Sequence, residues 1–498
     1  MNNTVSPSHP VKLDNASLNG LPSNVRGPAY DRRDITEGIL HIGVGGFHRA
    51  HQAVYVDDVI AETGDKQWGI CGVGLLQHDS RIRDALVPQD CLYAVVERGP
   101  GAATEARVIG AMTSFLFAPA NAEAVLEKMA AADIRIVSLT ITEGGYYLDP
   151  ETGESNLDHP DIEHDLQNPT QPVAAFGYLA EALDRRRQRG LRPFTVMSCD
   201  NVPGNGDVTK RMLLGFAARR DPSLRDWIAE NGAFPNSMVD RITPATTDAD
   251  RASIRETYGI DDAWPVVTEP FRQWVIEDAF CDGRPQWDRA GAQMTSDVHP
   301  YETMKIRLLN ASHSAMGYLG YLAGFEYIHE VMANDLFRKF VADFMEEEVT
   351  PILEEVPGID LATYKKTLVE RFSNPAIKDQ VSRICMDGSA KIPKFILPTV
   401  REQLQRGGPT KRASLVIASW CRAMAGTDDQ GSKIEVMDPM AGVLSEHARA
   451  AGTDPQKFLD VREVFGDDLP RSEVLVEQVR EALESLNEQG AMKTLAKY

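Results

Sequence analysis

Residues 39–51 read ILHIGVGGFHRAH, an apolar run that enters a glycine-rich turn and continues into a helical pattern ending near Ile60. This order of strand, turn and helix start is typical of the first unit of a dinucleotide-binding fold. Glycines at the turn let the backbone approach a pyrophosphate, which accepts hydrogen bonds from N–H groups at the helix start. The stretch therefore predicts a dinucleotide site with the contact residues Gly43, Gly45, Gly46, Phe47, His48 and Arg49.

Two features leave an alternative open. His48 stands where the G-x-G-x-x-G pattern has its third glycine, and a glycine-rich turn that binds no ligand is the other interpretation. A second glycine pair, Gly72 and Gly74, also follows an apolar run, but no helix start comes as closely after it.

The periodicity of apolar residues divides the chain into two parts. From Gly38 to about Arg289, short apolar runs alternate with helical patterns, which predicts βαβ units and a parallel sheet. The expected strands are 39–44, 68–73, 92–96, 134–141 and 194–199, with a helix over 121–132 between the third and the fourth. Beyond Tyr301 the pattern is almost wholly helical, over 302–323, 334–349, 361–371, 393–405, 412–425 and 472–488.

We therefore expect an α/β protein with two domains. Residues 1–295 form a Rossmann-type dinucleotide-binding domain with insertions, and residues 296–498 form a mainly α-helical domain that binds substrate and carries the catalytic groups. A chain of 498 residues is long enough for two or three domains at roughly 150 residues each.

Composition and charge limit the class of partner. The chain is 43% apolar and 25% charged, and no apolar run is long enough to span a membrane. The 52 lysines and arginines against 73 aspartates and glutamates give a net charge of −21, which repels nucleic acids and anionic lipid surfaces. We expect a small-molecule ligand, with no nucleic acid or membrane partner.

The cysteines and the opening residues indicate a cytoplasmic protein. The six cysteines are far apart and form neither a C-x-x-C pair nor the Cys/His spacing of a structural zinc site, so we expect thiols in a reducing compartment and no bound metal. The polar stretch from Met1 to about Glu37 lacks the charged start and apolar middle of a secretory signal.

Polar residues follow several of the expected strands, where a parallel sheet has its ligand crevice. Asp79 follows the second strand and is the candidate to hold the adenosine ribose and to repel the 2′-phosphate of NADP, although it lies farther from the glycines than usual and could be an ordinary loop aspartate. Glu143 belongs to the segment Thr140–Gly145 after the fourth strand, which could also be a simple turn. Asn201 follows the fifth strand, either as an amide donor to a substrate oxygen or as a turn asparagine.

The most informative group of residues lies in the segment 302–313. On a regular helix, Glu302, His313 and Asn310 fall at about 60°, 80° and 140° from Lys305, so the four share one sector. A buried lysine beside such groups is a candidate general base, because desolvation disfavours its ammonium form. The alternative is a surface ion pair between Glu302 and Lys305 with His313 in the core.

These motifs together resemble the polyol-specific long-chain dehydrogenases, the mannitol dehydrogenase family. The resemblance extends from about residue 35 to the C-terminus and rests on the glycine turn, on Thr140–Gly145 and Ser198–Asn201, and above all on KIRLLNASH at 305–313. It also includes VDRITP at 239–244, WPVV at 264–267 and DGSAKIP at 387–393. A string of Lys, Asn and His at this spacing is far more specific than a lone glycine-rich turn.

The resemblance implies a role for each matching residue. Lys305 is the general base, Asn201 and Asn310 donate to the reacting oxygen, and Glu302 relays the proton. Substrate contacts are His313, Arg383, Asp240 and Lys391, while Asp79 selects NAD and Glu143 belongs to the cofactor site. The family's members work without zinc and tend to be monomers.

The implied activity is zinc-independent oxidation of D-mannitol to D-fructose with NAD, and the reverse reduction. Oxidation of D-arabinitol and reduction of a hexuronate such as fructuronate are alternatives within the superfamily. An NAD-binding sensor without catalysis is an alternative of another class, and it would have no need for Lys305 with two convergent asparagines.

Overall fold

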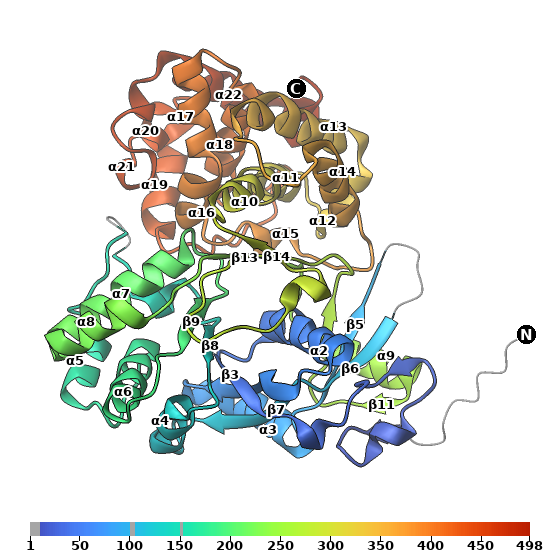
Figure 1. Cartoon of the computed structure of the whole chain (residues 1–498). Coiled ribbons are helices and arrows are strands. Elements are labelled where there is room, and N and C mark those ends of the chain that lie inside the picture. The colour runs from blue at the N-terminus through green and yellow to red at the C-terminus, as the bar shows by residue number, and fades with distance from the viewer. Residues whose placement is uncertain (1–9, 100–104, 150–152) are drawn as a thin grey trace, which may run out of the picture. The chain divides into compact units, whose positions relative to one another are not determined.

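The computed structural model describes residues 10–99, 105–149 and 153–498. The chain divides into two compact units, with unit 1 ending at Val298 and unit 2 starting at His299 (Figure 1). The expected domain boundary, 295/296, lies three residues before this division.

A five-stranded parallel sheet forms the centre of unit 1. Its order is β7 (Met112–Phe117), β4 (Gly69–Gly74), β3 (Glu37–Ile42), β8 (Ile136–Leu139) and β9 (Thr195–Ser198), and every neighbouring pair is parallel. β3 comes first along the chain and lies in the middle, so the strand order reverses beside it. Ligands of such sheets bind at this reversal, outside the carboxyl ends of the strands. The predicted Rossmann-type fold is confirmed.

One strand was wrongly placed in this sheet by the sequence pattern. The run 92–96 forms β5 (Tyr93–Glu97), but β5 pairs with β6 (Glu105–Ile109) and β12 (Val266–Thr268) in a separate mixed sheet that ends with β2 (Val25–Arg26). The parallel sheet instead takes β7 at its edge. Only Met112 of β7 is fully buried, because an edge strand needs no continuous apolar run, and the pattern therefore lacked a signal for it.

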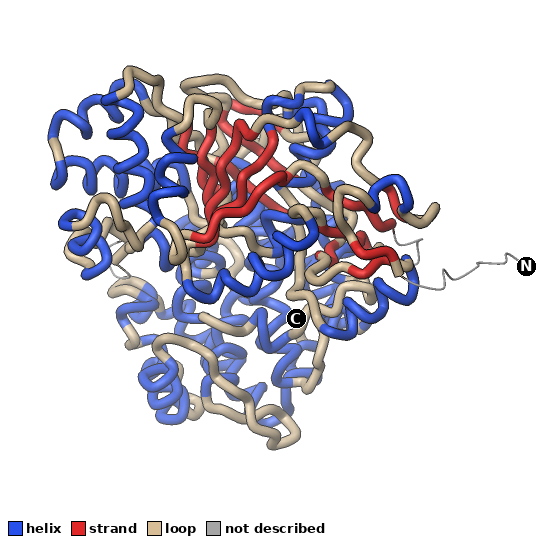
Figure 2. Tube along the Cα trace, turned by 90° about the horizontal axis from the view of Figure 1, so that it is seen from below, coloured by secondary structure: helices blue, strands red, loops and turns tan. Residues whose placement is uncertain are grey.

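Helices cover both faces of the parallel sheet, and Figure 2 shows them around the red strands. On one face, α4 (Ala122–Ala130), α6 (Ala175–Gln188) and α7 (Asn205–Arg220) pack on Leu40 and Ile42 of β3. On the other face, α2 (Gln52–Thr63) packs on Ile39. Successive residues of a strand point to opposite faces, so His41 lies on the same face as Ile39, beneath α2.

The remaining elements of unit 1 extend this framework. Its other helices are α1 (Gly46–Ala50), α3 (Ser80–Leu86), α5 (Pro160–Gln167), α8 (Pro222–Asn231) and α9 (Asp248–Tyr258). The remaining strands are β1 (Val11–Lys12), β10 (Ser237–Asp240), β11 (Ile260–Asp261), β13 (Gln273–Glu277) and β14 (Gln293–Thr295).

Unit 2 is helical throughout its secondary structure. Its α-helices are α10 (His299–Lys305), α11 (Ala311–Leu322), α12 (Ile328–Ala333), α13 (Asp335–Asp343), α14 (Leu361–Phe372), α15 (Val381–Ile384), α16 (Gly388–Phe395), α17 (Leu397–Arg406), α18 (Lys411–Met424), α19 (Ala441–Ala451), α20 (Gln456–Leu459), α21 (Arg462–Phe465) and α22 (Glu473–Leu495). Two π-helical segments, η8 (Ile306–Asn310) and η9 (Phe344–Val349), extend α10 and α13. In the centre of the unit, α18 packs against both α11 and α22.

Three predicted helices change geometry or break. The helix expected over 334–349 changes from α13 to the π segment η9 at Phe344. The helix expected over 302–323 changes to π geometry at Ile306 and returns to α geometry at Ala311. The helix expected over 393–405 is wrong as a single element, since α16 ends at Phe395 and α17 begins at Leu397. Pro393 inside α16 has no N–H to donate and Pro398 restricts the residue before it, which explains a break between them.

None of the helices among the described residues is both long and apolar enough to cross a membrane.

Candidate active site

The glycine turn leaves the centre of the parallel sheet. Gly43 has a φ of 94°, and a Cβ built on it would lie 2.1 Å from the carbonyl oxygen of Thr140, so the position requires glycine. A Cβ built on Gly45 would meet nothing nearer than the Gly43 carbonyl oxygen, 4.0 Å away. The turn therefore leaves open space where another molecule can approach its backbone.

His48 fills the place of the missing third glycine with a buried ring. The ring stacks on that of His41, with centroids 3.4 Å apart, and burial lowers the pKa of both histidines well below the usual range. The third glycine normally allows close packing of helix on strand. Here the helix is instead interrupted at His51, whose ψ of −90° separates α1 from α2.

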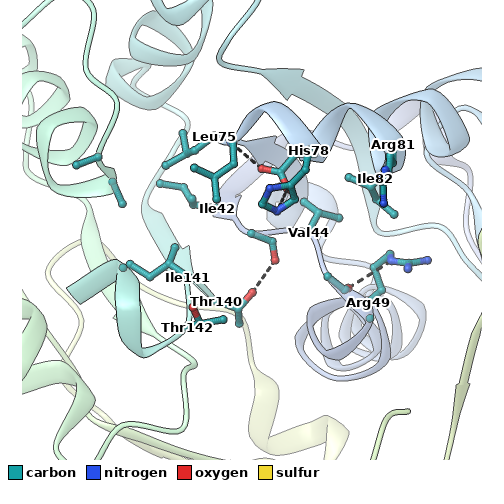
Figure 3. Close-up of a pocket in the computed structure, with 18 of the residues that line it drawn as sticks. Ile42, Val44, Arg49, Leu75, His78, Arg81, Ile82, Thr140, Ile141 and Thr142 are labelled. Carbon is teal, nitrogen blue, oxygen red and sulfur yellow. Dashed lines mark hydrogen bonds and ion pairs between the residues drawn. The ribbon is translucent and has the colours of Figure 1, made fainter. Parts of the chain in front are cut away.

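A pocket of about 600 Å³ opens beside the turn, within the usual size range of small-ligand sites (Figure 3). Five of the predicted cofactor residues line it: Gly43, Gly45, Gly46, Arg49 and Asp79. The other three lie outside its lining. His48 is buried against His41, Phe47 stacks on His51 with ring centroids 4.9 Å apart, and Glu143 starts the short 3₁₀ helix η6 (Glu143–Tyr146).

Asp79 is at the pocket wall after β4, as expected of an aspartate that faces a ribose. Its Oδ2 accepts a hydrogen bond from the Leu76 backbone N–H at 2.8 Å, and its side chain is 23% exposed. A Cβ on Gly74 would lie 2.6 Å from the Asp79 Cβ, so the second glycine pair of the sequence provides room for this carboxylate. His78 and Arg81 line the pocket beside Asp79.

The loop after β8 is held by a buried carboxylate. Asp200 accepts hydrogen bonds from the backbone N–H groups of Ile141 and Thr142, at 3.0 and 2.9 Å, and from the Tyr146 hydroxyl at 2.6 Å. Thr142 has a φ of 62°, a conformation that costs energy for a β-branched residue and is often found at functional sites. Burial raises the pKa of Asp200. Asn201 comes next in the chain, at the carboxyl end of β9.

Asp240 closes β10 and is buried, opposite Gln273 of β13. The next residue, Arg241, donates hydrogen bonds to the carbonyl oxygens of Glu269 and Ala50. Asp240 is thus on a rigid element of unit 1, as a substrate contact requires.

Unit 2 carries the predicted general base. Lys305 is the last residue of α10 and is only 7% exposed, and Glu302, one turn earlier, is 8% exposed. The ring of His313, on α11, contacts that of Phe372 with centroids 4.7 Å apart. Arg307 points elsewhere and forms an ion pair with Glu402. The surface ion pair considered as an alternative requires exposure, which these two buried side chains do not have.

The π segment η8 changes how these residues share a face. A π turn holds about one more residue than an α turn, so the residues that follow lie about 100° further back around the axis. Asn310 and His313 then fall at about 40° and −20° from Lys305, instead of about 140° and 80°. The sector that holds Glu302, Lys305, Asn310 and His313 therefore narrows from about 140° to about 80°. Such single π turns are frequent at functional sites.

Two further predicted contacts lie on neighbouring short helices of unit 2. Arg383 on α15 is 56% exposed, and its guanidinium donates to Oδ1 of the buried Asp379 at 2.8 and 2.5 Å. Lys391 on α16 donates from Nζ to the Ile384 carbonyl oxygen at 3.3 Å. Asp379 thereby directs Arg383, a role that the sequence pattern did not indicate.

Comparison with known proteins identifies the family. The Mannitol dehydrogenase Rossmann domain matches residues 37–289, and the Mannitol dehydrogenase C-terminal domain matches residues 297–487. The chain belongs to the mannitol dehydrogenase family. The resemblance stated from its motifs is confirmed.

Relatives in the mannitol dehydrogenase family match nearly the whole chain. Mannitol 2-dehydrogenase of Aspergillus fumigatus is 51% identical, covering 98% of this chain and 99% of its own. The Pseudomonas fluorescens mannitol 2-dehydrogenase, solved as a ternary complex with NAD and D-mannitol, is 47% identical with a TM-score of 0.90, covering 98% of this chain and 99% of its own. A D-sorbitol dehydrogenase in substrate-free form is 38% identical with a TM-score of 0.90, covering 97% and 100%.

The pocket also contains residues for which the sequence motifs predicted no role, although Ile141 and Trp264 lie within those motifs. These residues are mainly apolar and come from distant parts of the chain: Leu75, Leu76, Ile82, Ile141, Tyr147, Val173, Ala174, Ala175 and Trp264. The ends of the second and fourth strands were recognisable places for such residues. Nothing in the sequence pattern indicated 173–175, which reach the pocket only through the packing of α6 on the sheet.

Within the parts of the chain that the structure describes, no three His, Cys, Asp or Glu side chains gather closely enough to hold a metal ion.

Proposed function

We propose that this enzyme oxidises D-mannitol to D-fructose with NAD and catalyses the reverse reduction, without zinc and with Lys305 as the general base. The observation that carries the proposal is the match along nearly the full chain to the Pseudomonas fluorescens enzyme, whose structure holds NAD and D-mannitol together. Three further observations support the proposal. Lys305 is buried, the η8 turn places the predicted catalytic residues of unit 2 in a narrower sector, and the glycine turn leaves open space beside Gly45.

The pocket of unit 1 fits NAD by its shape and chemistry. Gly45 leaves space for a pyrophosphate beside the turn, and the apolar residues Leu75, Ile141 and Val173 provide walls for a flat ring. Asp79 provides a carboxylate for ribose hydroxyls. Bound in this pocket, NAD would supply the acceptor for the hydride of the carbinol carbon.

The chain's own residues handle the proton and the charge. Lys305, when neutral, accepts the proton of the reacting hydroxyl, and Glu302 passes it towards solvent. The amides of Asn201 and Asn310 donate to the substrate oxygen, where negative charge develops, so they act as an oxyanion hole in place of a metal. The other polyol hydroxyls bind to His313, Arg383, Asp240 and Lys391. An analogue that lacks the hydroxyl facing the buried Asp240 leaves that carboxylate unsatisfied.

The decisive experiment is an absorbance assay at 340 nm with purified protein, NAD and a panel of polyols. D-mannitol should give the highest kcat/KM. D-sorbitol belongs in the panel because a D-sorbitol dehydrogenase shares the fold at 38% identity, and D-arabinitol and a hexuronate test the remaining alternatives. NAD binding with no turnover of any substrate would indicate the sensor instead.

Cofactor choice should depend on Asp79. A carboxylate at this position repels the 2′-phosphate of NADP, so Asp79→Ala should raise the NADP-to-NAD ratio of kcat/KM by about tenfold, which corresponds to ~1.4 kcal/mol. Arg81 and His78 remain at the pocket wall to attract the phosphate. Asp84→Ala is the matched control, because Asp84 lies on α3 in an ion pair with Arg83 and outside the pocket lining. An unchanged ratio in Asp79→Ala would show that another residue selects the cofactor.

Activity should survive removal of metal ions. Exhaustive dialysis against EDTA should leave kcat within twofold of the untreated enzyme, because Lys305 and the two asparagines replace a Lewis acid in this mechanism. Atomic absorption of the dialysed sample checks that no zinc remains. A loss of activity that added zinc restores would contradict the proposal.

We further propose a monomeric enzyme of the cytoplasm that binds neither nucleic acid nor membranes. The six free cysteines suit a reducing compartment, and the net charge of −21 repels polyanions. Sedimentation analysis tests the oligomeric state directly.

A further inference from the structure

Beneath the glycine turn, four polar side chains lie on one buried face of the parallel sheet. His41 of β3 and Ser138 of β8 are direct partners across the two strands, and both are fully buried. Gln52 approaches them from α2, and Thr140 follows Ser138 by two residues on the same side. All four are in unit 1, on the face of the sheet that α2 covers.

The distances join these side chains into one chain that ends at the turn. The Gln52 amide lies 2.9 Å from Ser138 Oγ, which lies 2.8 Å from His41 Nδ1. His41 Nε2 lies 2.9 Å from Thr140 Oγ1 and 3.2 Å from the Gly43 carbonyl oxygen. Thr140 Oγ1 lies 2.6 Å from that same oxygen, and Figure 3 draws this bond.

Hydrogen-bond chemistry sets the direction of the chain. A carbonyl oxygen only accepts, so the single hydroxyl proton of Thr140 must point at Gly43. His41 Nε2 then faces two acceptors, the Thr140 and Gly43 oxygens, and must itself carry a proton. Nδ1 remains to be assigned.

Burial decides the state of Nδ1. Because burial lowers the pKa of His41 to about 3, the ring is neutral at physiological pH and Nδ1 accepts a hydrogen bond from the Ser138 hydroxyl. With its single proton directed at His41, Ser138 Oγ can only accept from Gln52, so the amide atom 2.9 Å away must be the nitrogen. In its present orientation the Gln52 amide nitrogen is buried and has no hydrogen-bond partner in the described part of the chain. Rotating the amide by 180° exchanges its nitrogen and oxygen and lets the nitrogen donate to Ser138.

We propose that the donor chain from Gln52 through Ser138 and His41 to Thr140 holds the Gly43 carbonyl and so presets the glycine turn for the dinucleotide. Gly43 has a φ of 94°, which glycine adopts without strain, and its carbonyl also accepts from the Gly45 N–H at 2.7 Å. With its carbonyl held by three donors, the turn keeps the shape that leaves the space beside Gly45 open. His41, Ser138 and Gln52 do not line the pocket and act only as positioning residues. The proposal rests on the proposed NAD site.

The first test removes one hydroxyl. Thr140→Val keeps the shape of the side chain but removes the donor, and it should weaken NAD binding, measured by calorimetry, by about tenfold while kcat at saturating NAD changes less than twofold. Thr140→Ser should restore the affinity. Thr209→Val is the matched control, because Thr209 is buried in α7 and donates to the Asn205 carbonyl oxygen, also at 2.6 Å, away from the pocket.

Ser138→Ala provides a second variant that does not line the pocket. It should weaken NAD binding in the same direction but by less, because Thr140 still donates directly to Gly43. This variant also keeps the test decisive if Thr140→Val fails to fold.

The second test observes the tautomer. Long-range ¹H–¹⁵N NMR of the ¹⁵N-histidine-labelled protein should show His41 neutral with its proton on Nε2 between pH 6 and 8, with the signal assigned by its loss in His41→Gln. A proton on Nδ1, or a charged ring, would overturn the assignment. If the wild type binds no NAD, the proposed function fails and the tautomer result still stands. If the wild type binds NAD and both Thr140→Val and Ser138→Ala bind it equally well, the positioning role is wrong.

Discussion

Replacing Lys305 by alanine should lower kcat and kcat/KM for D-mannitol oxidation together, by roughly 10²- to 10⁴-fold, the range that general base catalysis contributes. Lys305 is only 7% exposed at the junction of α10 and η8, so bulk water has little access to take over its role as the base. NAD affinity should change little, since the glycine turn belongs to unit 1. Steady-state kinetics and calorimetric NAD titration measure the two effects separately.

The pH dependence distinguishes a lost base from lost structure. A base works only when deprotonated, so wild-type kcat/KM for oxidation should rise with pH and then level off, and Lys305→Ala should lose this rise. Glu302→Ala should slow turnover but keep the profile, because it only relays the proton. Lys366→Ala, an exposed lysine on α14, should behave as wild type. If Lys305→Ala retained more than about a tenth of the turnover with the same profile, the base would be elsewhere, with His313 the next candidate.

Replacing Asn310 by alanine should lower kcat by roughly 10²- to 10³-fold with a small change in KM, because a donor aimed at a developing oxyanion contributes ~2.7–4 kcal/mol in the transition state alone. Asn201→Ala should have a similar effect from unit 1. The Asn310 Oδ1 is buried and lacks a hydrogen-bond partner among the described residues, so this oxygen adds no hydrogen bond to the helix there.

Ser312→Ala is the control for Asn310, since Ser312 is buried two residues later and its hydroxyl also lacks a partner in the described structure. It should leave kcat within twofold. Equal losses of kcat in Asn310→Ala and Ser312→Ala, together with a lower melting temperature in both, would mean that the segment tolerates no substitution and that Asn310 has no special role.

Local patterns in the sequence were enough to predict the class of fold and the kind of site. A strand followed at once by Gly43, Gly45 and Gly46 can be recognised from neighbouring residues alone, because glycine is the residue that the positive φ at Gly43 and the close approach of the Thr140 carbonyl require. The helical sector of Glu302, Lys305 and His313 is also local, since three to eleven residues of one helix place these side chains. The string from Lys305 to His313 is also contiguous in the sequence, so the family could be recognised without the structure.

Tertiary structure alone decided the features that depend on distant partners. The pattern predicted a strand at Tyr93–Glu97 and none at Met112–Phe117, and pairing with β12 and with β4 assigns each to its sheet. The π geometry of η8 adds a residue to one turn, which no period of 3.6 can reveal. The donor chain from Gln52 to Gly43 joins residues up to 99 positions apart, such as His41 and Thr140. Hydrogen bonds across strands are set by sheet register, which the whole core determines and no single segment contains.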